Sequence, residues 1–158
     1  MRRKDREVKD EKEIKRILDS LKICRLGLSG KEGVYIVPLN YGYEYQDGRL
    51  TLYFHSAKLG KKIEMLKENP AVGFEMDGEG QLVEGEIPCS YTYRYASIIG
   101  NGKGEIVEDE EEKKEGLRIL MEAQTGKKFQ LEEFESKYVK AISVIKVAVD
   151  SFSCKENK

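Results

Sequence analysis

The chain contains no tryptophan, one histidine, three prolines and three cysteines. The cysteines, Cys24, Cys89 and Cys154, are odd in number, and no two lie at the spacing of metal ligands. Because the chain also has only one histidine, a structural zinc site is not expected, and we predict no metal centre. The thiols are expected to be reduced and to pack as small apolar side chains.

Long apolar runs are also missing. No stretch approaches the roughly 20 residues of a transmembrane helix, and the N-terminal MRRKDREVKDEKE lacks the apolar region of a signal peptide. The 28 basic residues nearly balance the 29 acidic ones, so no net field favours nucleic acid or a membrane surface. We therefore expect a cytoplasmic protein that binds neither, and the length of 158 residues predicts one domain, 1–158.

The pattern of apolar residues predicts a mainly β protein with helices. The β-branched and aromatic residues cluster in short runs between turn residues, and Asp47-Gly48 is a strong hairpin signal. The predicted helices are 10–22, 57–69 and one opened by the acidic run 108–112; the predicted strands are 23–28, 34–41, 43–45, 50–54, 71–76, 81–86 (after a turn at 77–80), 91–107 and 139–149. This order does not alternate as a parallel α/β fold would, and it predicts an antiparallel barrel decorated with two or three helices.

The most informative segment is YFHSAKLGKKIEMLKENP at 53–70. It begins as the end of an apolar strand and continues into a helix. Leu59, Ile63 and Leu66 fall at i, i+4 and i+7, which predicts a single buried stripe on that helix.

Lys61 and Lys62 fall in the first turn of this helix, where a cation opposes the helix dipole at a cost of roughly 0.3–1 kcal/mol. A bound anion such as phosphate would explain the two ammonium groups, the free backbone N–H donors and the upstream hydroxyl of Ser56 together. The alternative is an ordinary helix with a solvated basic face.

Five stretches in this order resemble a known family: MRRKDREV at the start, CRLGL at 24–28, YIVPLNYGY at 35–43, YFHSAKLGKKIEMLKENP at 53–70 and SIIGNGKGEIVED at 97–109. Over nearly its whole length the chain resembles the pyridoxamine 5′-phosphate oxidase-related flavoproteins, and within them the nitroimidazole-resistance (Nim-type) branch. The resemblance implies an FMN-binding split β-barrel that forms a homodimer, with FMN, less often FAD or haem, in two clefts at the subunit interface.

The resemblance also implies roles for particular residues. Ser56, Lys61 and Lys62 match the positions that hold the flavin phosphate in the family. The strand that contains Val37, Pro38, Leu39 and Asn40 matches the strand beneath the flavin ring, with His55 beside the phosphate group. From the sequence pattern alone, Pro38 equally indicates an edge strand.

The function that the resemblance implies is an FMN-dependent oxidoreductase that reduces a small electron-poor, nitroaromatic-like substrate. A nicotinamide nucleotide or another donor would supply the electrons, and without a GxGxxG fingerprint the nucleotide would visit the flavin cleft. His55 is the candidate catalytic residue, since a histidine can deliver a proton near neutral pH; alternatively it only hydrogen-bonds within the fold.

Two further expectations qualify this picture. The chain lacks the tryptophan-bearing C-terminal motif of the true pyridoxamine phosphate oxidases, so we do not expect it to oxidise pyridoxamine phosphate. Tyr91, Tyr93 and Tyr95 lie on one strand face and are expected to pack against the barrel, the alternative being a platform for a substrate. The alternative function is a non-catalytic flavin- or haem-binding protein for storage, sensing or protection, with His55 as the haem ligand.

Overall fold

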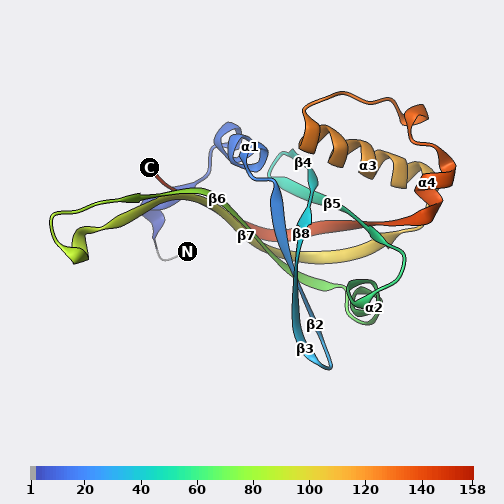
Figure 1. Cartoon of the computed structure of the whole chain (residues 1–158), viewed down its shortest axis with the longest axis horizontal. Coiled ribbons are helices and arrows are strands. Elements are labelled where there is room, and N and C mark those ends of the chain that lie inside the picture. Colours follow the sequence, from blue (N-terminus) through green and yellow to red (C-terminus); the bar gives the residue numbers. More distant parts are fainter. Residues whose placement is uncertain (1–2) are drawn as a thin grey trace.

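The computed structural model describes residues 3–158. In chain order its elements are η1 (Lys4–Arg6), β1 (Glu7–Val8), α1 (Glu11–Ser20), β2 (Ile23–Gly30), β3 (Gly33–Asn40), β4 (Gly42–Gln46), β5 (Arg49–Ala57), α2 (Lys61–Glu68), β6 (Ala71–Val83), η2 (Pro88–Ser90), β7 (Thr92–Val107), α3 (Glu110–Thr125), η3 (Leu131–Glu133), α4 (Ser136–Ala141) and β8 (Ile142–Asn157). The long strands run through the middle of the molecule, with α1 and α3 on one side and α2 on the other (Figure 1).

The strands form one antiparallel sheet in the order β3-β2-β6-β7-β8-β5-β4, and β1 pairs with β8. Its two terminal strands, β3 and β4, follow one another in the chain with only Tyr41 between them. The chain itself therefore brings the two edges of the sheet together, without a ladder between them in residues 3–158. This is a split β-barrel, and it confirms the predicted antiparallel barrel.

The interior of the barrel is filled with apolar side chains. On β2, Cys24, Leu26 and Leu28 alternate inward and are at most 1% exposed, because successive strand residues point to opposite faces. Phe54 and Ile145 meet them from other strands and are fully buried. Each such side chain contributes roughly 1.5–3 kcal/mol of burial free energy. A ligand must therefore bind outside this packed interior.

Helix α1 closes one end of the barrel, as its sequence pattern predicts. The Asp10 carboxylate accepts hydrogen bonds from two backbone N–H groups of the first turn, each at 3.0 Å. Ile14, Ile17 and Leu18 are buried in the core. The Tyr41 hydroxyl donates to the Leu18 carbonyl oxygen at 2.8 Å and satisfies an acceptor in the last turn of the helix.

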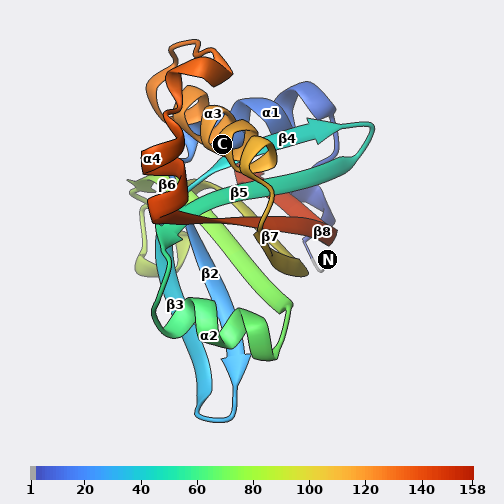
Figure 2. The same cartoon turned by 90° about the vertical axis from the view of Figure 1, so that its right-hand side faces the viewer.

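Helix α3 covers β4 and β5 at very short range (Figure 2). Gly42 on β4 makes this approach possible, because a Cβ there would lie 2.5 Å from the Cα of Leu120. Asp109 caps the start of α3 by accepting from the N–H of Glu112 at 2.9 Å, and Gly126 ends it in the left-handed region at φ 70°.

The Asp47-Gly48 hairpin turn is confirmed. Asp47 has φ 51° and Gly48 has φ 75°, so both central residues adopt the positive φ of a type I′ turn between β4 and β5. Gly48 carries this conformation without the steric cost that a side chain brings.

The predicted turn at 77–80 is wrong. β6 runs through it as one strand, and its pairing with β7 changes register between Gly78 and Gln81. The glycines that resemble a turn in sequence thus form a β-bulge. Beyond it, β6 and β7 continue as a two-stranded arm that extends past the barrel (Figure 1).

The expected packing of the tyrosines is also wrong for two of them. Tyr91 is 45% and Tyr93 is 51% exposed, because this end of β7 lies in the arm and not over the core. Tyr95 is half-buried, and its hydroxyl accepts a 3.5 Å hydrogen bond from Nη1 of Arg6.

The C-terminal strand begins later and ends later than predicted. Residues 136–141 form α4, and β8 then continues to Asn157. Val139 lies in α4 and is buried there. A short run of apolar residues therefore does not show whether the chain forms a helix or a strand. Within residues 3–158, no helix is both long and apolar enough to cross a bilayer.

Candidate functional site

A gap lies between the outer edges of β3 and β5. β3 pairs only with β2, and β4 pairs with β5 only as far as Tyr53, so residues 54–57 have a ladder partner only on the β8 side in the described chain. The two edges lie near one another. Their unpaired backbone groups are free to hydrogen-bond a ligand.

The four ring-binding candidates line the β3 side of this gap. Val37 and Leu39 are half-buried and pack against the core, whereas Pro38 and Asn40 point to the exposed face. Pro38 lies opposite Arg25 in an unshifted ladder. It therefore marks an edge strand, as one interpretation of the sequence held, and causes no bulge.

Asn40 is already engaged within the fold. Its side-chain amide donates to the Lys22 carbonyl at 3.0 Å and to Oε1 of Gln124 at 3.2 Å. These contacts join the end of β3 to α3. Its side chain fixes the strand, so a ligand would meet this position through the backbone.

His55 and Ser56 lie on the β5 side and point to opposite faces of the strand. His55 is exposed, and its imidazole forms no hydrogen bond with residues 3–158. Ser56 is 5% exposed, and its hydroxyl donates to the Ala57 carbonyl at 2.9 Å. Of the two, the imidazole is the group free to contact a substrate.

Helix α2 starts at Gly60, which precedes Lys61 and has φ 131° with no side chain to cap the helix. The Gly60 carbonyl accepts from the N–H groups of Ile63 and Glu64, at 2.9 and 3.2 Å. Helix geometry leaves the N–H groups of Lys61 and Lys62 without intrahelical partners. The two lysines occupy the first turn, as the sequence predicts.

The buried stripe of α2 differs from the prediction in one residue. Ile63, Met65 and Leu66 are buried, but Leu59 is 83% exposed. Because the helix begins only at Lys61, Leu59 lies outside it and the i, i+4 relation does not apply.

The two lysines have different surroundings. The Nζ of Lys61 lies 3.2 Å from Oε2 of Glu32 and 5.4 Å from the centre of the Tyr35 ring. Lys62 is half-buried, and its ammonium has neither an ion pair nor a hydrogen bond within residues 3–158. Lys62 thus carries the unneutralised charge at this helix start.

A cavity of about 320 Å³ separates α2 from the β2–β3 hairpin. Its charged lining consists of two lysines and three glutamates: Lys31, Lys61, Glu32, Glu64 and Glu68. The excess of carboxylates disfavours an anion there. An anion at the start of α2 would instead lie on the side of Lys62.

An apolar hollow on the outer face of β3, β2 and β6 was not predicted from the sequence. This hollow, of about 330 Å³, includes Gly27, Gly73 and Val34. Gly27 pairs with Gly73 on one side and with Ile36 on the other, so the two glycines form its floor. The hollow depends on Gly27 and Gly73 lying opposite each other on the exposed face of the sheet. Their pairing cannot be known from the sequence alone.

Arg25 lies on the same outer face and is neutralised there. Its guanidinium pairs with Glu75 at 2.9 Å and with Asp77. It is therefore an anchored surface residue, and it is not available as a free charge for a cofactor.

Two cysteines behave as expected and one does not. Cys24 and Cys154 are buried, and this burial raises the pKa of their thiols to about 12 and about 11. Such thiols are protonated and unreactive near neutral pH. Cys89, in η2, is exposed, so the expectation of packing is wrong there.

Comparison with known proteins shows which family has this architecture. The family model described as pyridoxamine 5′-phosphate oxidase matches residues 10–156. The chain belongs to this family. The putative 5-nitroimidazole antibiotic resistance protein from Bacteroides thetaiotaomicron is 36% identical to it, with a TM-score of 0.80 over 95% of this chain and 86% of that protein. Both the family and the similarity to a nitroimidazole-resistance protein confirm the resemblance found in the sequence.

Solved structures of lower sequence identity share the fold. The flavocytochrome Anf3 from Azotobacter vinelandii has a TM-score of 0.79 at 20% identity, covering all of this chain (100%) and 72% of that one. The FAD and heme binding protein from Mycobacterium smegmatis has a TM-score of 0.78 at 16% identity, covering 97% of this chain and 74% of that one. No curated protein matches the chain significantly in sequence.

Proposed function

We propose that this chain binds FMN at the gap between β3 and β5, with the phosphate at the start of α2. The observation that carries the proposal is Lys62, a half-buried residue whose ammonium has no carboxylate partner in the described chain, at a helix start with two N–H groups that lack intrahelical partners. A dianionic phosphate would neutralise that charge and accept those N–H groups. These residues fit the phosphate end of a flavin.

The free edge of β3 fits the ring. Val37, Pro38 and Leu39 place backbone groups along it, and the side chains of Val37 and Leu39 pack against the core. A planar isoalloxazine ring presents hydrogen-bonding groups along its own edge, which suits recognition by a strand backbone. In this arrangement, the backbone of β3 would hydrogen-bond the edge of the ring, and Lys62 would bind the phosphate.

The proposed activity is reduction of a small electron-poor aromatic, such as a nitroaromatic. The bound flavin supplies the electron transfer. His55 would donate a proton from its imidazole to the substrate oxygen, since it is exposed and unbonded beside the phosphate group. The strand edge would orient the substrate over the ring and exclude water from its face. A small-molecule substrate and a nicotinamide nucleotide donor are the expected partners.

A second copy of this chain is the partner proposed for the outer sheet face. Val34 is 75%, Ile36 is 63% and Ile99 is 52% exposed, and the pairing places all three on the face that holds the apolar hollow. Val34 and Ile36 adjoin the apolar hollow, whereas the Arg25–Glu75 ion pair lies between them and Ile99. Exposed apolar side chains beside such a hollow favour an interface. Because β3 contributes both to this face and to the gap, a homodimer would enclose the flavin.

The test of the activity is a single-turnover experiment without oxygen. Protein loaded with FMN is reduced with a nicotinamide nucleotide or dithionite and then mixed with a nitroimidazole. Reoxidation of the flavin together with loss of the nitro absorbance supports the activity. A flavin that stays reduced in the presence of excess nitroimidazole contradicts it and favours a protein that binds flavin without turnover.

The same exposed imidazole makes haem binding the second candidate. His55 is the only histidine of the chain, and an unbonded imidazole on the surface is free to ligate iron. Haem binding would appear as a Soret band that is lost in His55→Ala. A protein that shows no Soret band after incubation with haemin removes this candidate.

A further inference from the structure

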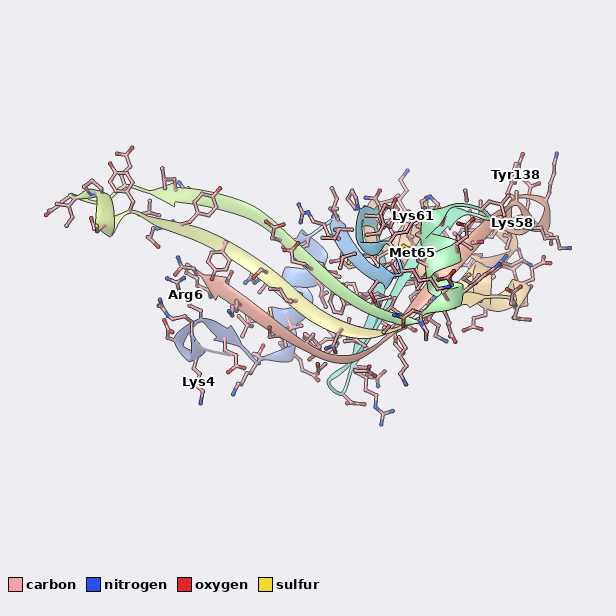
Figure 3. The ribbon with its side chains drawn as sticks, turned by 90° about the horizontal axis from the view of Figure 1, so that it is seen from below. Lys4, Arg6, Lys58, Lys61, Met65 and Tyr138 are labelled. Atoms are coloured by element: carbon pink, nitrogen blue, oxygen red, sulfur yellow. The ribbon has the colours of Figure 1, made fainter. Side chains whose placement is uncertain are left out.

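A cavity of about 180 Å³ lies on the other flank of α2, where β7 passes into α3 and β8 begins. Lys58, from the loop before α2, Lys67, from its last turn, and Lys113, from the start of α3, all line it. The α2 region and the distant start of α3 thus place three lysines around one small space. Figure 3 shows Lys58 apart from Lys61 and Met65, which belong to the other flank of the helix.

The charges in this cavity are not balanced by the protein. None of the three lysines lies within ion-pair distance of a carboxylate in residues 3–158, whereas the neighbouring Lys114 pairs with Glu111 at 2.7 Å. Glu108 is the one carboxylate in the lining, and it forms no ion pair with them. The Nζ of Lys113 donates to the Ile142 carbonyl at 3.0 Å. This contact holds the ammonium in place and leaves its other N–H donors free for a ligand.

A buried hydroxyl completes the lining. Ser143 is 6% exposed, and its hydroxyl forms no hydrogen bond within the described chain. Within the described chain no fully buried side-chain N or O atom lacks a partner, so the Ser143 hydroxyl keeps some exposure, and Ser143 is one of the residues that line the cavity. A hydroxyl beside three ammonium groups is a donor set for an oxyanion.

We propose that this cavity binds a single phosphate group, either free inorganic phosphate or the phosphate end of a small metabolite. Its volume is below the roughly 300–1,000 Å³ of pockets for drug-sized ligands, which excludes a nucleotide held entirely within it. The site is separate from the proposed flavin phosphate site. Ile63 and Lys67 line it from one side of α2, whereas Lys62 lies 100° further round the helix from Ile63 by the ~3.6-residue repeat.

The experiment is a calorimetric titration of inorganic phosphate, and separately of glycerol 3-phosphate, into the purified protein at low salt. Lys67→Met and Ser143→Ala should each weaken binding, Lys67→Met by about tenfold or more, as expected for loss of a charge-assisted contact. Lys12→Met is the matched control, since Lys12 is also an exposed helix lysine without an ion pair among residues 3–158. It should leave binding unchanged. Tighter binding of glycerol 3-phosphate than of phosphate would assign the site to a metabolite, and the reverse to free phosphate.

A further variant separates this site from the flavin site. Lys62→Met should leave phosphate binding at the second site intact. Phosphate binding lost in Lys62→Met but retained in Lys67→Met would overturn the proposal, because the ligand would then occupy the start of α2. Absence of saturable binding, or equal weakening in Lys12→Met, would overturn it as well.

Discussion

Lys61 and Glu32 form an ion pair, with 3.2 Å between Nζ and Oε2, that joins the start of α2 to the tip of the β2–β3 hairpin. The Glu32 carboxylate neutralises the charge of Lys61, so Lys62 is the cation of the first turn that has no carboxylate partner in the described chain. Because both side chains of the pair are well exposed, it contributes little to stability. Its consequence is that two adjacent lysines with the same sequence signal have different roles.

The first prediction follows from this difference. Lys62→Ala should weaken FMN binding by roughly 1.5–3 kcal/mol, the scale of a charge-assisted hydrogen bond, or about 10- to 150-fold in Kd. Lys61→Ala, whose ammonium already has a partner, should weaken it less. Quenching of FMN fluorescence on titration measures both. Unchanged affinity in Lys62→Ala would remove the start of α2 as the phosphate site.

The second prediction concerns His55. His55→Ala should leave flavin affinity and thermal stability largely intact, since the imidazole makes no hydrogen bond within residues 3–158. Reoxidation of the reduced flavin by a nitroaromatic should slow by about 10²-fold or more, the usual contribution of a positioned acid. Stopped-flow absorbance measures this rate. A variant that reacts at the wild-type rate would exclude proton donation by His55.

The third prediction tests the homodimer. Ile36→Lys puts a charge at an exposed apolar position next to the hollow over Gly27, so it should convert a dimer into a monomer. Sedimentation velocity gives the oligomeric state. Lys127→Met, at an exposed position just beyond α3 and away from this sheet face, is the control and should stay dimeric. If wild-type protein sediments as a monomer at micromolar concentration, the outer face is not the interface.

The fourth prediction concerns packing. Gly42→Ala should destabilise the protein by about 3 kcal/mol or more, because its Cβ would collide with the backbone of Leu120 at 2.5 Å. Gly30→Ala should cost under about 1 kcal/mol, since its Cβ meets only the flexible end of Met65 at 3.0 Å. Urea unfolding compares the two. Equal losses would show that α3 does not pack on β4 as described.

The fifth prediction is a loss of stability at alkaline pH. Burial raises the pKa of Cys24 from 9.0 to about 12, so above pH 9 the unfolded chain releases this proton and the folded chain keeps it. The free energy of unfolding is therefore highest below pH 9 and falls towards pH 12, and burial raises the pKa of Tyr41 and Tyr53 in the same direction. From pH 8.5 to pH 10, wild-type protein should lose about 1 kcal/mol more than Cys24→Ala. Urea unfolding at both pH values measures this difference, and parallel losses in the two proteins would contradict it.

The sequence predicted best where a local signal decides the structure. The Asp47-Gly48 pair defines its turn by positive φ, and the spacing of Ile14, Ile17 and Leu18 defines the buried face of α1. The order of the predicted strands and helices indicated an antiparallel barrel, and the family resemblance specified it as a split barrel. Lys61 and Lys62 were singled out by their place in the first turn of a helix, and the resemblance pointed to the same two residues independently.

The errors occur where tertiary structure overrides a local pattern. The glycines of 77–80 form a bulge, because β7 offers a continuous partner on both sides of it. Tyr93 has the alternation of a barrel strand but lies in the arm, where no core is present. The difference between Lys61 and Lys62 depends on Glu32, which lies 29 residues earlier in the chain and reaches α2 only through the hairpin. Sequence alone could not predict that contact.

The most direct test of the account is the visible absorption spectrum of the purified protein, recorded before and after incubation with excess FMN and dialysis. We predict a retained two-band flavin spectrum at one FMN per chain, and loss of most of it in Lys62→Ala on the same dialysis. A colourless wild-type protein that releases all added FMN would contradict flavin binding at the gap between β3 and β5.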